Sequence, residues 1–162
     1  MPYDKGESRE PSAMPIPADT TGKPATTDNS NTPPHILVVD DDQQIRETVR
    51  FLLEDAGYTV EEAVDGAEAL ALLRSSAQPL VALLDNLMPR INGVGVLDAV
   101  VANDTLRRRH AYLLITASPR SVPPETLAQL ELLSGALIRK PFDISTLLDA
   151  VAEAQQRLSS AG

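Results

Sequence analysis

The chain contains neither cysteine nor tryptophan, and it has only three tyrosines and two phenylalanines among 162 residues. Without cysteine it cannot form a disulfide, an iron-sulfur cluster or a thiolate zinc site, and nothing calls for an oxidising compartment. So few aromatic rings leave too few stacking platforms for a protein that binds single-stranded nucleic acid. The core must therefore be built from Leu, Val, Ile and Ala.

Positive charge and long apolar runs are scarce as well. Lys and Arg number 14 against 23 Asp and Glu, which gives a net charge of −9. A charge of this sign repels nucleic acid and anionic lipid, so we expect neither as a partner. No apolar run approaches the roughly 20 residues of a membrane span, and the N-terminus lacks the apolar stretch of a secretory signal. We expect a cytoplasmic protein with no membrane segment.

Aliphatic residues are nearly absent from residues 1–34, which hold seven of the 13 prolines together with many Ser, Thr, Asp and Asn residues. Such a segment cannot bury enough apolar surface to offset the entropy of ordering it. We predict a disordered leader over 1–34 and one folded domain over 35–160. The sequence ends soon after the last predicted helix, so we expect no attached DNA-binding or catalytic output domain.

The folded domain alternates between two apolar periodicities. Short aliphatic runs bounded by turn residues predict five buried strands, at 36–39, 59–63, 80–84, 112–115 and 136–138. Apolar residues three and four apart predict a helix after each strand, within 45–56, 69–73, 97–101, 127–133 and 144–158. Strict alternation of this kind predicts an α/β fold, a doubly wound (βα)5 domain with a five-stranded parallel sheet.

Polar residues directly follow four of the predicted strands. They are Asp40, Asp41 and Asp42 after the first, Asp85 after the third, Thr116 after the fourth, and Lys140 after the fifth. The carboxyl ends of parallel strands share one edge of the sheet, where ligands bind. Asp40, Asp41 and Asp85 would repel one another there unless a hard cation lay between them, and carboxylates with water suit Mg²⁺. A carboxylate beside Mg²⁺ can attack phosphorus, while an ammonium and a hydroxyl neutralise the phosphoryl oxygens.

Each of these residues also has a purely structural interpretation. An Asp after a strand often caps the next helix, and we expect one of the three acids at 40–42 to do so. Thr116 can equally be a buried hydroxyl bonded to the backbone. Lys140 is more informative, because it is the only Lys among eleven basic residues after position 34. A compact point charge is favoured there over a bulky guanidinium.

These residues resemble the receiver domain of bacterial two-component response regulators, and the resemblance extends from His35 to about Leu158. It rests on the run ILVVDDD at 36–42, on LLDNLMP around Asp85 with Gly93 following, on Thr116, and on KPF at 140–142. The resemblance implies the flavodoxin-like receiver fold, in which the chain acts as a signalling protein. Its only catalysis would be phosphoryl transfer onto its own aspartate.

The resemblance also implies a role for each residue of the site. Asp85 would be the phosphoacceptor, with Asp41 as a direct Mg²⁺ ligand, Asp40 acting mostly through water, and the backbone carbonyl of Leu87 completing the metal site. Thr116 would be the switch hydroxyl. Lys140 would bond the aspartate and then the phosphoryl group.

Partners follow from the same resemblance. The donor would be a sensor histidine kinase or a histidine phosphotransfer protein, because neither His35 nor His110 lies in the helical setting of a phosphodonor. The phosphorylated chain would signal by docking to another protein, as a monomer or a weak homodimer.

Two segments depart from the family pattern. Leu137 stands three residues before the lysine, where active receivers carry an aromatic residue that turns inward, so transmission must rely on Thr116 and the backbone after it. The segment 118–124 is rich in proline, which predicts a stiff loop and a short fourth helix that begins at Pro123 or Pro124. These departures leave a phosphorylation-independent, receiver-like adaptor as an alternative. Leu87 is apolar, which predicts shielding of an acyl phosphate from water.

Other interpretations are weaker. A Mg²⁺-dependent aspartyl-phosphate phosphatase of the haloacid dehalogenase type would use Asp40, but Gln43 and Gln44 replace the hydroxyl or aliphatic residue expected after its two acids. A dinucleotide-binding domain is excluded because three acids replace the Gly-rich turn after the first strand. The basic cluster at 107–110 is predicted at the end of the third helix, where cations favour the helix dipole.

Overall fold

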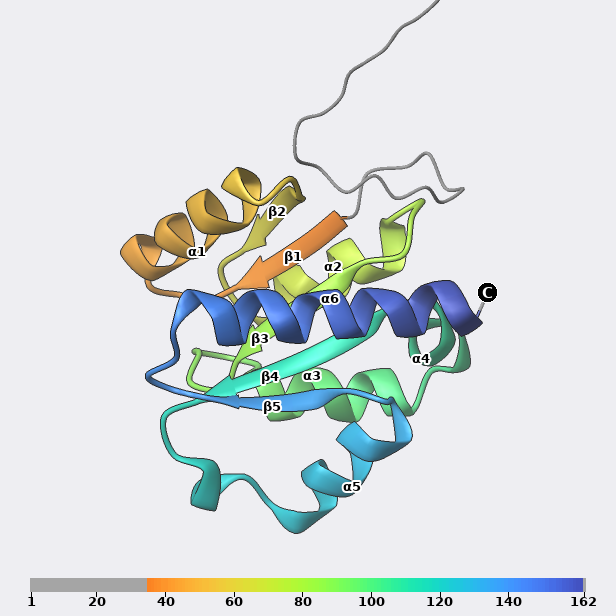
Figure 1. The fold of residues 1–162 in the computed structure, drawn as a ribbon. Coiled ribbons are helices and arrows are strands. Elements are labelled where there is room, and N and C mark those ends of the chain that lie inside the picture. Colours follow the sequence, from red (N-terminus) through yellow and green to blue (C-terminus); the bar gives the residue numbers. More distant parts are fainter. Residues whose placement is uncertain (1–34, 162) are drawn as a thin grey trace, which may run out of the picture. The chain divides into compact units, whose positions relative to one another are not determined.

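Five parallel strands form a single sheet in the computed structural model, which describes residues 35–161 (Figure 1). The strands are β1 (His35–Val39), β2 (Thr59–Ala63), β3 (Val81–Asp85), β4 (Ala111–Thr116) and β5 (Ala136–Arg139). Their order in the sheet is β2-β1-β3-β4-β5, and each neighbouring pair is parallel. The predicted α/β class and parallel sheet are confirmed. The leader predicted over residues 1–34 lies outside the described residues.

Helices cover both faces of this sheet. Within residues 35–161 they are α1 (Gln43–Asp55), α2 (Gly66–Ser75), α3 (Gly93–Val101), α4 (Asp104–Arg109), α5 (Pro124–Leu132) and α6 (Ile144–Ala161). Successive strand side chains point to opposite faces, so Leu37 packs in the cluster with α2, α3 and α5, whereas Ile36 packs in the cluster with α1 and α6. The doubly wound arrangement is therefore confirmed. None of the described helices is both long enough and apolar enough to cross a membrane.

The first two helices begin at side-chain caps. Asp42 accepts hydrogen bonds from the backbone N–H groups of Gln44 and Ile45, at 3.0 and 3.2 Å, and so caps α1. The expectation that one of the three acids at 40–42 caps the next helix is thus confirmed. Asp65 caps α2 by accepting from the N–H of Glu68 at 2.9 Å. These caps fix where the chain turns away from the carboxyl ends of β1 and β2.

The sequence predicted that the basic cluster at 107–110 ends the third helix, but the structure places it in a separate helix and at the residue after that helix. Helix α3 stops at Val101, and Asn103 then caps the separate short helix α4 by accepting from the N–H of Leu106 at 3.1 Å. The prediction was wrong because Asn103 caps a new helix after a break of two residues, Ala102 and Asn103. The three arginines of 107–109 form the last turn of α4.

The fourth predicted helix is short, as its prolines indicated. This helix, α5, spans nine residues with Pro124 in its first turn, and a single 3-10 turn at Pro119–Ser121 precedes it. Pro123 is in an extended conformation and offers no side-chain hydrogen bond to the helix. Proline geometry therefore sets the start of α5, which has no polar side-chain cap.

His110 is buried at the opposite edge of the sheet, where the amino ends of β3 and β4 meet α2. The N–H of Leu80 donates to Nδ1 at 3.0 Å, so Nε2 carries the ring proton and donates to the carbonyl of Leu73 at 2.9 Å. Burial lowers the pKa of His110 below its ordinary value of 6.5. The ring is therefore an uncharged bridge between three elements.

We expect His110→Phe to lower the free energy of unfolding by about 2 to 4 kcal/mol, because it leaves two buried backbone groups without partners. The pH dependence should change as well. In the wild type the folded ring stays neutral, whereas the unfolded ring binds a proton below about pH 6.5, so stability falls as the pH drops through that range. Urea unfolding at pH 8 and pH 5.5 measures both effects, and equal losses in wild type and variant on acidification would contradict this account.

Candidate functional site

Three acids meet at the carboxyl ends of β1 and β3. Asp40 and Asp85 are buried and Asp41 is exposed, and one carboxylate oxygen from each lies within 4.8 Å of the others. The sheet order explains this proximity, because β3 is the neighbour of β1 although β2 intervenes in the sequence. The chain reverses its winding direction between these strands, which is where open parallel sheets bind ligands.

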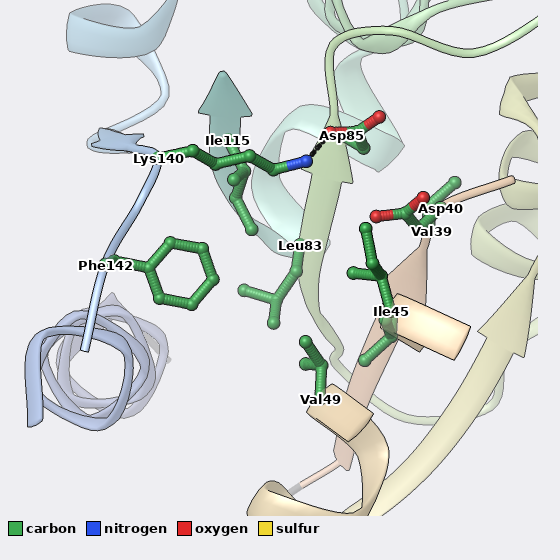
Figure 2. A pocket seen from close by; sticks show the side chains of 10 residues that line it. Val39, Asp40, Ile45, Val49, Leu83, Asp85, Ile115, Lys140 and Phe142 are labelled. Carbon is green, nitrogen blue, oxygen red and sulfur yellow. Dashed lines mark hydrogen bonds and ion pairs between the residues drawn. The ribbon is translucent and has the colours of Figure 1, made fainter. Parts of the chain in front are cut away.

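Lys140 reaches the same place from β5. Its Nζ donates to Oδ1 of Asp85 at 2.7 Å, and Figure 2 shows this contact beside Asp40. Its backbone N–H donates to the carbonyl of Thr116 at 2.8 Å, which holds the residue against the end of β4. The ammonium therefore bonds the residue predicted as phosphoacceptor, in the way the sequence indicated.

The pKa of Asp40 is raised by its crowded surroundings. Burial raises the pKa of Asp40, the neighbouring charges of Asp85 and Asp41 raise it further, and a hydrogen bond from the Asp42 backbone N–H together with Lys140 opposes the rise. A cation among these carboxylates would favour the charged form. Three carboxylates with solvent access through Asp41 are a donor set that fits Mg²⁺, which binds oxygen ligands and keeps several waters.

Thr116 lies at the end of β4, beside β3, and is buried. Its Oγ1 accepts a hydrogen bond from the N–H of Ser118 at 3.0 Å. Among the hydrogen bonds of residues 35–161, none joins this hydroxyl to Asp85 or Lys140. The structural interpretation of Thr116 as a backbone-bonded hydroxyl therefore describes this conformation, while its position keeps it at the same sheet edge as the acids.

Two leucines predicted from the sequence flank the site in different ways. The side chain of Leu87 is 71% exposed, two residues beyond Asp85. Leu137 is half-buried, pairs with Leu114 across β4 and β5, and packs against the core cluster of the α2, α3 and α5 face. An aliphatic side chain thus fills the position where the family pattern has an aromatic ring.

The loop after Asp85 is fixed by contacts that the sequence did not reveal. Arg90 has a positive φ of 67° and pairs with the buried carboxylate of Asp65, and the N–H of Gly66 donates to the carbonyl of Ile91 at 3.0 Å. Hydrogen bonds from the Glu68 N–H and from Arg90 lower the pKa of Asp65. No sequence pattern connects positions 65 and 90, which belong to different βα units.

Gly93 starts α3 immediately beside the site. A Cβ atom at this position would lie 2.5 Å from Cδ1 of Leu114 and 3.0 Å from the carbonyl oxygen of Asp85. Only glycine lets α3 approach the end of β3 this closely. The sequence signal was the turn glycine after the Met-Pro dipeptide.

An apolar pocket lies next to the Asp85 to Lys140 contact, on the α1 and α6 face. Figure 2 shows Leu83, Val49, Ile45 and Phe142 around it, and Asp40 lines it as well. These apolar walls keep water from one side of the acids, so charges at the site are less screened than on an open surface.

The fold and the site together define a signalling receiver of the two-component type. Residues 36–152 match the family model for the response regulator receiver domain, and the chain belongs to this family. The resemblance to receiver domains found in the sequence is therefore confirmed.

The relatives and structural neighbours agree with this membership. Response regulator MprA from Mycobacterium sp. (strain KMS) is 37% identical over 128 residues, which are 78% of this chain and 53% of that protein. MprA from Mycobacterium ulcerans is 40% identical over 114 residues, 70% of this chain and 46% of that protein. The chain thus spans about half the length of the curated relatives it matches.

Solved receiver structures share the fold. Vibrio cholerae chemotaxis protein CheY4 has a TM-score of 0.62 at 30% identity, covering 76% of this chain and 99% of that one. Thermotoga maritima response regulator protein TrrA, solved in complex with Mg²⁺-BeF, has a TM-score of 0.65 at 26% identity, covering 75% of this chain and 98% of that one.

We expect Asp40→Asn to raise the free energy of unfolding in Mg²⁺-free buffer by on the order of 1 kcal/mol. The variant removes one of three crowded charges, while an amide oxygen can still accept from the Asp42 N–H. Added Mg²⁺ should then stabilise the wild type more than the variant. Denaturant unfolding with EDTA and with Mg²⁺ measures both, and Asp149→Asn on the exposed side of α6 is the control. A less stable Asp40→Asn protein in EDTA would rule out charge crowding as the dominant effect.

Proposed function

We propose that the chain accepts a phosphoryl group on Asp85, with Mg²⁺ bound by Asp40, Asp41, Asp85 and the backbone carbonyl of Leu87. The observation that carries this proposal is the contact of Lys140 Nζ with Asp85 at 2.7 Å, beside two further carboxylates. The TrrA neighbour, which binds Mg²⁺-BeF, supports the use of Mg²⁺. Bound Mg²⁺ would neutralise charge on the phosphoryl oxygens.

The chain's own residues divide the work of the transfer. A carboxylate oxygen of Asp85 forms the new bond to phosphorus, while the phosphorus-nitrogen bond of the donor breaks and the imidazole leaves with the electron pair. Lys140 shifts its hydrogen bond from the aspartate to a phosphoryl oxygen. Thr116 exchanges its bond with the Ser118 N–H for one to the phosphoryl group, so the segment after β4 moves with it.

Asp85 is a better acceptor than Asp40. Lys140 bonds Asp85 and not Asp40, and one oxygen of Asp40 already accepts from the Asp42 N–H. These contacts argue against the phosphatase that would use Asp40.

The phosphodonor in this proposal is a sensor histidine kinase or a histidine phosphotransfer protein. His110 cannot act as donor, because both its ring nitrogens are bonded inside the fold. Kinases of this kind use ATP, which points to the cytoplasm as the place of exchange. The phosphorylated chain then docks to a protein partner, as a monomer or a weak homodimer, without binding nucleic acid or membrane through this domain.

The test is labelling with acetyl phosphate and Mg²⁺, followed by intact mass and a mobility-shift gel. We expect wild type to gain one phosphoryl group and Asp85→Asn to gain none. Labelling of the variant at the wild-type level would move the acceptor to Asp40. If neither protein is labelled by acetyl phosphate or by a phosphohistidine donor, the phosphorylation-independent adaptor becomes the better description, consistent with Leu137 in place of an aromatic residue.

We also expect the acyl phosphate of the wild type to be long-lived, because the exposed Leu87 offers neither a donor nor an acceptor to an attacking water. Leu87→Asn should shorten the half-life by a factor on the order of 3, since its amide can orient water beside Asp85. The rate is measured by following the fraction of phosphorylated protein with intact mass after acetyl phosphate is removed. Met88→Leu, one residue further on, is the control, and an unchanged or longer half-life in Leu87→Asn counts against shielding.

A further inference from the structure

Arg46 connects the metal-binding acids to the edge strand of the sheet. It lies in the first turns of α1 and only 12% of its side chain is exposed. Its Nε donates to Oε1 of Glu62 on β2 at 2.8 Å, and one terminal nitrogen donates to the backbone carbonyl of Asp40, also at 2.8 Å. The Arg46 guanidinium therefore connects α1, β2 and the end of β1, where Asp40 directly follows the strand.

The backbone of Asp40 is held on both sides by these contacts. Its N–H donates to the carbonyl of Ala63 on β2 at 3.2 Å, and its carbonyl accepts from Arg46. One carboxylate oxygen accepts from the Asp42 N–H at 2.9 Å. With the peptide group and one carboxylate oxygen fixed, the other oxygen of Asp40 has a defined direction, and so does the peptide that leads to Asp41.

Glu62 in turn fixes Arg46. Its second oxygen accepts from Arg50, one turn further along α1, at 2.7 Å, so its carboxylate is held between two arginines. The hydrogen bond from Arg46 makes the largest contribution to lowering the pKa of Glu62. Arg50 shares this partner but forms no hydrogen bond or ion pair with Asp40, and its side chain is about half exposed.

We propose that Arg46 is a positioning residue for the Mg²⁺ site, which it serves by holding the Asp40 carbonyl while Glu62 holds its guanidinium. It touches neither the reacting oxygens nor the metal, and it acts through the Asp40 backbone. The inference rests on the proposed function, because it assigns a role toward the Mg²⁺ that the acids would bind. Residues that hydrogen-bond to the ligands of a metal ion, without touching the ion, commonly orient those ligands.

The test measures Mg²⁺ binding by calorimetry and, separately, the rate of labelling by acetyl phosphate over a range of Mg²⁺ concentrations. We expect Arg46→Gln to weaken Mg²⁺ binding about 10-fold. The Mg²⁺ concentration for half-maximal labelling should rise by the same factor, while the rate at saturating Mg²⁺ stays close to that of the wild type.

Two further variants separate positioning from charge and from stability. Arg50→Gln removes the same charge from the same ion-pair cluster without touching Asp40, and it should leave Mg²⁺ binding unchanged. Arg46→Lys keeps the charge but cannot bond Glu62 and Asp40 together in the same planar geometry, so it should recover only part of the affinity. Denaturant unfolding in EDTA identifies any variant that fails to fold.

The outcomes are distinct. Equal Mg²⁺ affinity in wild type and Arg46→Gln would overturn the inference and leave the proposed function intact. Full affinity in Arg46→Lys, or an equal loss in Arg50→Gln, would replace positioning by a simple charge effect. A wild type that binds no Mg²⁺ would overturn the proposed metal site, and the role of Arg46 with it.

Discussion

Mutual repulsion among carboxylates is the constraint on which the rest of the site depends. Asp40, Asp41 and Asp85 are forced together by the placement of β1 beside β3, at a distance where like charges disfavour each other. Lys140, which offsets part of this repulsion, arrives from the end of β5, whereas the backbone N–H that bonds the Asp40 carboxylate belongs to Asp42, two residues further along the chain. The cluster therefore exists only when the whole sheet is assembled.

The two edges of the sheet are built from opposite kinds of chemistry. At the carboxyl edge, loops carry the charged groups that the proposed function assigns to a cation and a phosphoryl group. At the amino edge, His110 joins α2 to β3 and the Tyr112 hydroxyl donates to the Leu106 carbonyl, so neutral groups close the structure without any ligand. One edge of the sheet is thus closed by the chain's own neutral groups, whereas the other presents the charged groups on which the proposed function rests.

The sequence was sufficient for the sheet, because aliphatic runs such as the one before Asp40 define strands through burial alone. It also predicted that Asp85, Lys140, Asp40 and Asp41 lie at one edge of the sheet, since residues at strand ends inherit their position from the topology. Two kinds of feature could not be predicted. One is a contact between residues distant in the sequence, and the other is a helix that a single capping side chain starts. The Arg46 to Glu62 pair needs the register of α1 against β2, and α4 exists because Asn103 caps it.

Helix α5 differs from the other described helices in how it begins. Side chains of Asp42, Asp65, Asn92 and Asn103 cap α1 to α4, and Asp143 accepts from the Thr146 N–H at the start of α6. Helix α5 starts at a pair of prolines with no side-chain cap, although it follows the loop that begins at Thr116. Displacing the first turn of α5 would break no side-chain capping hydrogen bond, whereas displacing the first turn of any of the other five α-helices would break one.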